Sequence, residues 1–78
     1  MRILLIEDDE ALSDLLARCL REEAYAVDTA LDGQEGEWLC FENPYDLIIL
    51  DLMLPRLDGM QVLKRLRDGG LSTPVLIL

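Results

Sequence analysis

The chain has 78 residues, of which 51% are apolar, and it carries 7 basic and 16 acidic side chains and no histidine, for a net charge of −9. This length allows one domain at most. The charge argues against a basic nucleic-acid-binding face, and the apolar content argues against intrinsic disorder. The lack of histidine excludes histidine catalysis and histidine ligation of a metal.

The first half of the chain begins with a strand and a helix. Residues 3–6 form a short apolar run, which predicts a strand buried on both faces. Asp8 or Asp9 is suited to cap the helix that follows, while Ala24 stands where a glycine is expected after its end. The apolar residues at helical spacing, which predict one stripe of this helix, are Leu12, Leu15, Leu16, Cys19 and Leu20.

Strand and helix patterns continue to alternate in the second half. Residues 25–30 predict a second, less buried strand, and residues 34–42 predict a short helix. Residues 47–50 and 75–78 predict two further, strongly buried strands. The helix predicted between them is closed by Gly69-Gly70 and is marked by Met60, Val62, Leu63 and Leu66. Strict alternation with all-apolar strands predicts an α/β fold, in which a parallel sheet carries helices on both faces.

The two cysteines and the apolar runs indicate the cellular compartment of the protein. Cys19 and Cys40 have neither zinc-like nor redox-like spacing, so both are expected to be small buried apolar residues. No apolar run resembles a signal peptide or is long enough to span a membrane. We therefore expect a cytoplasmic protein with reduced thiols and no membrane contact.

Three acids follow the predicted buried strands. Glu7 and Asp8 come after the first strand, and Asp51 comes after the strand over residues 47–50. Ligands of open parallel sheets bind beyond the carboxyl ends of the strands. Where carboxylates converge without a basic partner, the pKa of one of them rises or the group binds a hard cation such as Mg²⁺. The alternative is that residues 7–10 are a solvated acidic loop or helix start.

Two other aspartates serve as a comparison. Asp46 precedes its strand, so it is expected at the opposite edge of the sheet. Asp58 stands in an Asp-Gly turn signal, so it is expected to begin a helix. Neither is a candidate for the acidic site.

The motifs of the chain resemble the receiver domain of two-component response regulators. The matching stretches are residues 2–10 (Arg-Ile-Leu-Leu-Ile-Glu-Asp-Asp-Glu), residues 45–55 (Tyr-Asp-Leu-Ile-Ile-Leu-Asp-Leu-Met-Leu-Pro) and Asp58-Gly59. Glu7-Asp8-Asp9-Glu10 and Leu52-Met53-Leu54-Pro55 are similar to the subfamily joined to a winged-helix DNA-binding domain. The resemblance implies a flavodoxin-like sheet of order 2-1-3-4. It also implies that residues 1–78 are the N-terminal part of a receiver domain, without its last helix, strand and helix.

The resemblance also implies roles for individual residues. Asp51 would be the phosphoacceptor, receiving a phosphoryl group from a sensor histidine kinase. Pro55 and Gly59 would shape the loop beside it. The implied ligands of Mg²⁺ are Glu7 through water, Asp8, Asp51 and the backbone carbonyl of Met53.

Parts of the family's machinery would lie beyond residue 78. The family has a Ser or Thr after the fourth strand and a Lys at the end of a fifth strand, and neither Thr73 nor Lys64 stands at such a place. The resemblance therefore implies that a small phosphodonor phosphorylates residues 1–78, taken on their own, slowly or undetectably. It implies a regulatory domain rather than an enzyme, with DNA contacted by a domain outside this chain.

Two other interpretations remain open. Phosphotransferases related to haloacid dehalogenases also place an aspartyl nucleophile after a strand, but they have a second acid two residues later, where this chain has Met53. Alternatively, the chain is a non-switching fragment that self-associates as a homo-oligomer through an exposed fourth strand, residues 75–78.

Overall fold

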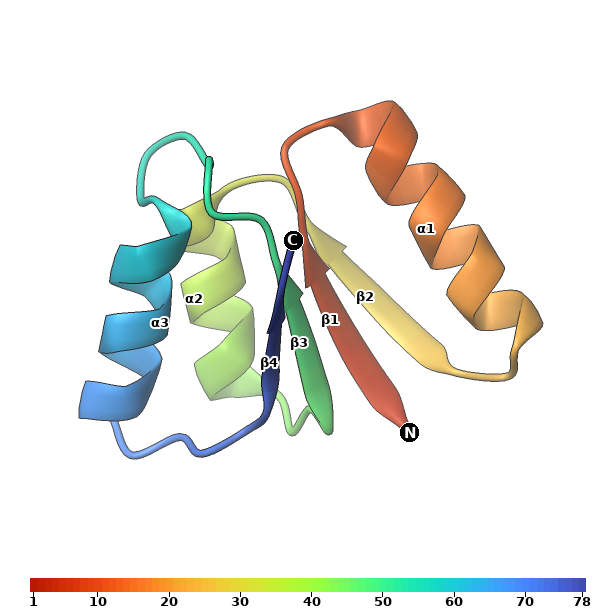
Figure 1. The fold of residues 1–78 in the computed structure, drawn as a ribbon. Helices are drawn as coiled ribbons and strands as arrows, with labels where there is room; N and C mark the ends of the chain where they lie inside the picture. Colours follow the sequence, from red (N-terminus) through yellow and green to blue (C-terminus); the bar gives the residue numbers. More distant parts are fainter.

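A computed structural model describes all 78 residues and confirms the alternation of strands and helices (Figure 1). The elements are β1 (Arg2–Ile6), α1 (Glu10–Glu22), β2 (Ala26–Ala30), α2 (Gly33–Glu42), β3 (Leu47–Leu50), α3 (Gly59–Asp68) and β4 (Val75–Ile77). The strands form one parallel sheet of order β2-β1-β3-β4. The expected α/β fold class and strand order are thus confirmed.

The register of the sheet brings the carboxyl ends of three strands level with one another. Ile6 at the end of β1 pairs with Ala30 of β2 and with Leu50 of β3. The ladder continues one residue further, because Glu7 N donates to the Ala30 carbonyl at 3.0 Å and Asp51 N donates to the Ile6 carbonyl at 3.0 Å. Residues that follow these strands therefore share one edge of the sheet.

Helices cover both faces of the sheet, with α2 and α3 on one side and α1 on the other (Figure 1). Side chains alternate between the faces along each strand, so β1, β2 and β3 each contribute to two cores. The larger core, on the side of α2 and α3, includes Leu4, Ile6, Leu50, Val62 and Leu66. The smaller core, on the side of α1, consists of Ile3, Leu5, Ala17, Val27 and Ile49.

The predicted apolar stripe of α1 is correct only in part. Leu16 and Leu20 pack against the smaller core, but Ser13 and Ala17 are the fully buried residues of this helix. Small side chains at these two places let the helix backbone come close to the sheet. The members of the predicted stripe that remain exposed are Leu12, Leu15 and Cys19.

The two cysteines differ in their surroundings. Cys40 is buried on the inner side of α2, as expected, and burial raises the pKa of its thiol to about 12. The expectation that Cys19 is buried is wrong, because it lies on the side of α1 that turns away from the sheet.

Strand β4 is less buried than its apolar sequence suggested. Val75 is half-buried against the larger core, but Leu76 is 53% exposed, and Ile77 and Leu78 are exposed as well. The physical reason is that β4 pairs with β3 on one side only. Leu76 pairs with Ile49 and so lies on the face of α1, which packs over β1 and β2 and does not reach β4.

Each helix begins at an aspartate whose side chain accepts a backbone N–H three residues later. The three N-caps are Asp9, Asp32 and Asp58, which accept from Leu12, Glu35 and Gln61 respectively. Asp58 thus begins a helix, as expected, and the cap of α1 is Asp9 rather than Asp8. Ala24, just after α1, adopts a left-handed backbone with φ of 69°, which is a conformation that glycine adopts without strain.

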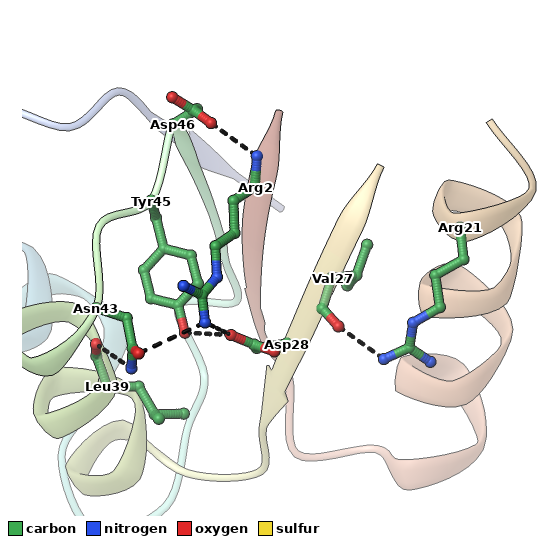
Figure 2. A network of polar contacts seen from close by, with 8 residues as sticks. All are labelled: Arg2, Arg21, Val27, Asp28, Leu39, Asn43, Tyr45 and Asp46. Atoms are coloured by element: carbon green, nitrogen blue, oxygen red, sulfur yellow. Dashed lines mark hydrogen bonds and ion pairs between the residues drawn. The ribbon is translucent and has the colours of Figure 1, made fainter. Parts of the chain in front are cut away.

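A polar network joins the strands near their amino-terminal ends (Figure 2). Asp28 of β2 accepts a hydrogen bond of 2.9 Å from the Arg2 guanidinium and one of 2.7 Å from the Tyr45 hydroxyl. The Arg2 guanidinium lies over the Tyr45 ring, 5.1 Å from its centroid, and its backbone N–H donates to Asp46 at 2.7 Å. The network holds the strands together near their amino-terminal ends, opposite the carboxyl edge of the sheet.

Candidate metal and phosphoryl site

Three carboxylates meet at the carboxyl edge of the sheet. Glu7 follows β1, Asp8 comes next to it, and Asp51 follows β3, the neighbour of β1. One carboxylate oxygen from each of them lies within 4.8 Å of the others. The structure therefore brings together the three acids that the strand ends indicated.

The three acids differ in burial. Glu7 is only 5% exposed, Asp51 is half-buried and Asp8 is exposed. Burial raises the pKa of Glu7, and the nearby Asp51 and Asp8 carboxylates raise it further. The Asp9 N–H donates to Glu7 Oε1 at 3.3 Å and offsets part of this effect. The site thus holds a buried carboxyl group whose negative form is disfavoured.

No basic side chain neutralises the three acids. The four ion pairs of the structure join Arg2 to Asp28, Arg56 to Asp32, Lys64 to Asp68 and Arg65 to Glu37. Three carboxylates without a basic partner form a set of hard oxygen donors with excess negative charge, which suits a divalent cation such as Mg²⁺. The residues present therefore fit the metal that their types suggested.

The loop after β3 is held by backbone contacts. The Met53 N–H donates to Asp51 Oδ1 at 3.1 Å, which orients the carboxylate, while the Met53 side chain is 84% exposed. The Pro55 carbonyl accepts the N–H of Leu57 at 2.8 Å and that of Gly33, at the start of α2, at 3.5 Å. This loop thus lies between the candidate site and the beginning of α2.

Gly59 lies against the backbone of Asp51. A Cβ atom at position 59 would be 2.5 Å from the Asp51 carbonyl oxygen and 2.6 Å from the Leu52 Cα. The Gly59 N–H donates to the Leu52 carbonyl at 2.9 Å. Only glycine allows this close approach, which fixes the end of β3 to the first turn of α3.

The comparison aspartates lie elsewhere. Asp46 precedes β3 and accepts the Arg2 backbone N–H at the opposite edge of the sheet, as expected. Asp58 is occupied as the cap of α3. The signal that separated these residues from Asp51 was their position relative to the apolar runs.

Comparison with known proteins decides the family. A family model described as the response regulator receiver domain matches residues 3–78. The chain belongs to the response regulator receiver family. It is therefore a receiver module of two-component systems, and such modules in transcriptional regulators are regulatory rather than catalytic. None of its helices has the length and apolar character needed to cross a membrane.

Curated relatives of this receiver domain are transcriptional regulatory proteins. All 78 residues align with DltR of Streptococcus agalactiae at 41% identity, with TcrA of Mycobacterium tuberculosis at 45% and with HprR of Escherichia coli at 44%. The alignments cover 35%, 31% and 34% of these proteins respectively. The chain thus spans about a third of the length of the curated relatives it matches.

Solved receiver structures share the fold. A receiver domain of a Francisella response regulator superposes with a TM-score of 0.95 at 36% identity, over 97% of this chain and 63% of that one. The response regulator TrrA of Thermotoga maritima, solved in complex with Mg²⁺ and BeF, superposes with a TM-score of 0.85 at 36% identity, over 97% of this chain and 64% of that one.

Proposed function

We propose that residues 1–78 are part of a cytoplasmic receiver domain in which Asp51 accepts a phosphoryl group from a sensor histidine kinase in the presence of Mg²⁺. The phosphorylated form controls a winged-helix DNA-binding domain outside these residues. The observation that carries the proposal is the cluster of Glu7, Asp8 and Asp51, whose oxygens lie within 4.8 Å at the carboxyl edge of the sheet. The relatives named as transcriptional regulatory proteins support the proposed control of a DNA-binding domain.

The proposed reaction moves one phosphoryl group between two side chains. A carboxylate oxygen of Asp51 attacks phosphorus in line with the bond to the kinase histidine. The O–P bond forms as the P–N bond breaks, and the imidazole nitrogen keeps the electron pair. Such a transfer depends on positioning and on neutralising charge. Mg²⁺, when bound, supplies the positive charge that draws the nucleophile and the phosphoryl oxygens together.

The residues of the chain contribute binding and orientation. Asp8, Asp51 and the Met53 backbone carbonyl are the proposed direct ligands of the metal, and Glu7 acts through water. The Met53 N–H holds one oxygen of the Asp51 carboxylate at 3.1 Å. Pro55 in the loop and Gly59 against the Asp51 backbone keep this region in place.

Titration with Mg²⁺ tests the metal site. Backbone amide signals near Glu7 and Asp51 are expected to shift saturably, and Asp51→Asn is expected to abolish this response while the circular dichroism spectrum stays unchanged. Asp58→Asn is the matched control, because asparagine caps a helix as well as aspartate does. Undiminished Mg²⁺ binding by Asp51→Asn, or no binding by the folded chain, would contradict the site.

A small acyl phosphate donor tests the acceptor. Labelling is expected to be slow, because the single lysine of the chain, Lys64, pairs with Asp68 on α3 instead of standing at the site. The label that forms should require Mg²⁺, be removed by hydroxylamine and be absent from Asp51→Asn. Intact mass measurement follows all three properties. A label that survives in Asp51→Asn would show that Asp51 is not the acceptor.

The exposure of β4 supports a second candidate, self-association of the 78-residue chain. One edge of β4 is unpaired, and Leu76, Ile77 and Leu78 are exposed beside it. Unprotected apolar edge strands pair with other copies. Sedimentation is expected to show concentration-dependent oligomers that Leu76→Lys removes and that Leu15→Lys, on exposed α1, does not. A monomer at all concentrations would exclude this candidate.

A further inference from the structure

Helix α2 presents two aromatic side chains on its outer side. Trp38, the single tryptophan of the chain, is 61% exposed, and Phe41 is 47% exposed. The opposite side of the helix is buried through Gly33, Gly36 and Cys40. Large aromatic side chains are usually buried or at interfaces, so an exposed pair on an otherwise well-packed helix indicates a contact surface.

Acidic residues flank this aromatic pair. Glu35 and Glu42 stand three residues before and four residues after Trp38, which places them on the same side of the helix. Both are exposed, and neither takes part in an ion pair. The third acid of α2, Glu37, pairs with Arg65 of α3, and the helix contains no basic residue. We call Glu35, Trp38, Phe41 and Glu42 the aromatic–acidic face.

Neighbouring elements support this face. The Phe41 ring lies against Gly69 at the end of α3, where a Cβ atom would be 2.5 Å from Phe41 Cζ. The ion pair between Glu37 and Arg65 joins α2 to α3 a little further along. The Asp32 side chain caps the start of α2 at 2.8 Å from Glu35 N. The face is thus carried by a helix that is fixed at both ends.

We propose that the aromatic–acidic face binds a basic segment of a partner protein, with an arginine as its anchor. A guanidinium group can stack on the Trp38 indole by a cation–π interaction. Its N–H groups can then donate to the carboxylates of Glu35 and Glu42. Arginine suits this arrangement better than lysine, because its planar group stacks and donates at the same time.

Charge complementarity selects this occupant over others. Nucleic acid and anionic membranes would be repelled by Glu35 and Glu42, and the same face of a second copy would be repelled as well, because it carries the same two carboxylates. A purely apolar partner would cover both carboxylates without pairing them, which is unfavourable. Of these occupants, only a cationic segment can contact the aromatic surface and pair with both acids at the same time.

The intrinsic fluorescence of Trp38 tests the proposal directly, because no other tryptophan contributes. Titration of the full chain with a short arginine-rich peptide should change this fluorescence saturably, and added salt should weaken the binding. A lysine-rich peptide of equal length and charge should bind more weakly, and a glutamate-rich peptide should not bind.

Variants distinguish binding at this face from attraction to the overall negative charge of the chain. The double variant Glu35→Gln with Glu42→Gln should weaken binding about tenfold or more, the change expected for a loss of about 1.4 kcal/mol. The matched double variant Glu22→Gln with Glu23→Gln, two exposed acids at the end of α1, should bind as the unmodified chain does. Trp38→Leu, followed by the anisotropy of a labelled peptide and checked for folding by circular dichroism, should lose binding.

Three results would overturn the proposal. One is the absence of binding by the folded, unmodified chain. Another is unchanged binding by Trp38→Leu. The third is equal loss in the two double variants together with equal affinity for the arginine and lysine peptides, since that combination describes attraction to overall negative charge.

Discussion

The Tyr45 hydroxyl donates a hydrogen bond of 2.7 Å to the same Asp28 oxygen that accepts the Arg2 guanidinium at 2.9 Å (Figure 2). One carboxylate oxygen therefore joins β1, β2 and the segment that leads into β3. The hydrogen bond from Tyr45 and then that from Arg2 lower the pKa of Asp28. Burial and the bond to Asp28 raise the pKa of Tyr45.

Tyr45→Phe should lower the free energy of unfolding by about 1 kcal/mol, the typical net value of such a hydrogen bond. The ring and its packing are kept, so the change isolates the hydroxyl. Urea denaturation followed by circular dichroism measures the difference. Tyr25→Phe is the control, because Tyr25 is exposed and makes no side-chain hydrogen bond. Equal losses in both variants would deny the contribution of the Asp28 bond.

Asp28 should make stability depend on acidity. Its pKa is lowered in the folded state, so its stabilising contribution is complete above the ordinary carboxyl pKa of about 3.9 and is lost as pH falls through the lower, folded value. The unmodified chain should thus exceed Asp28→Asn in unfolding free energy at about pH 7, and the difference should shrink at about pH 3. A difference that stays constant or grows toward acid would contradict this sign.

Ala24→Gly should stabilise the chain by up to about 1 kcal/mol, since Ala24 has φ of 69° and glycine adopts this conformation without a Cβ clash. Thermal unfolding measures the effect. Ala11→Gly, at an exposed position within α1, should change the melting temperature in the opposite direction, because glycine costs about 1 kcal/mol in a helix. If Ala24→Gly also destabilises, the turn does not strain the alanine.

Gly59→Ala should destabilise by about 1–3 kcal/mol, because the added methyl group meets backbone atoms that cannot turn away. It should also shift the amide signal of Asp51, whose carbonyl oxygen lies 2.5 Å from the new Cβ. Gly36→Ala is the comparison, since its Cβ would meet side-chain atoms of Ile6 rather than backbone atoms, and alanine favours the helix. Its cost should be smaller, and the Asp51 signal should stay in place.

Glu7→Gln should raise stability by about 1 kcal/mol in the absence of divalent cations, a gain typical of relieving a functional site. The reason is that a buried negative charge beside Asp51 is removed. The same change should reduce the stabilisation that Mg²⁺ gives. Thermal unfolding with and without Mg²⁺ measures both effects. Glu10→Gln, an exposed acid nearby, should leave the response to Mg²⁺ unchanged.

The sequence predicted those parts of the molecule in which a pattern of residues is compatible with only one structure. Apolar runs such as residues 47–50 are buried on both faces, so their ends locate Asp51 without further information. The acidic site follows from this, because adjacent parallel strands place their ends together. The pairing of β1 with β3, which the family resemblance supplied, completes it.

Other features depend on distances between elements, which a pattern of residues does not contain. The stripe of α1 specified an apolar side but not which part of it meets the sheet, so Leu12 and Leu15 remain exposed while Ser13 is buried. The bond between Tyr45 and Asp28 depends on the register of three strands. Asp28 belongs to no motif, and Tyr45 only opens the stretch that resembles the family, so the sequence carried no signal that joins the two residues.

Two positions near Asp51 differ in how much change they permit. At position 59 the backbone of Asp51 leaves no room for any side chain, so every substitution disturbs the acceptor. At position 53, two residues after Asp51, the side chain is 84% exposed, while the backbone N–H donates to the Asp51 carboxylate. Variation among related chains can thus alter the surroundings of the acceptor through position 53 while position 59 keeps its geometry constant.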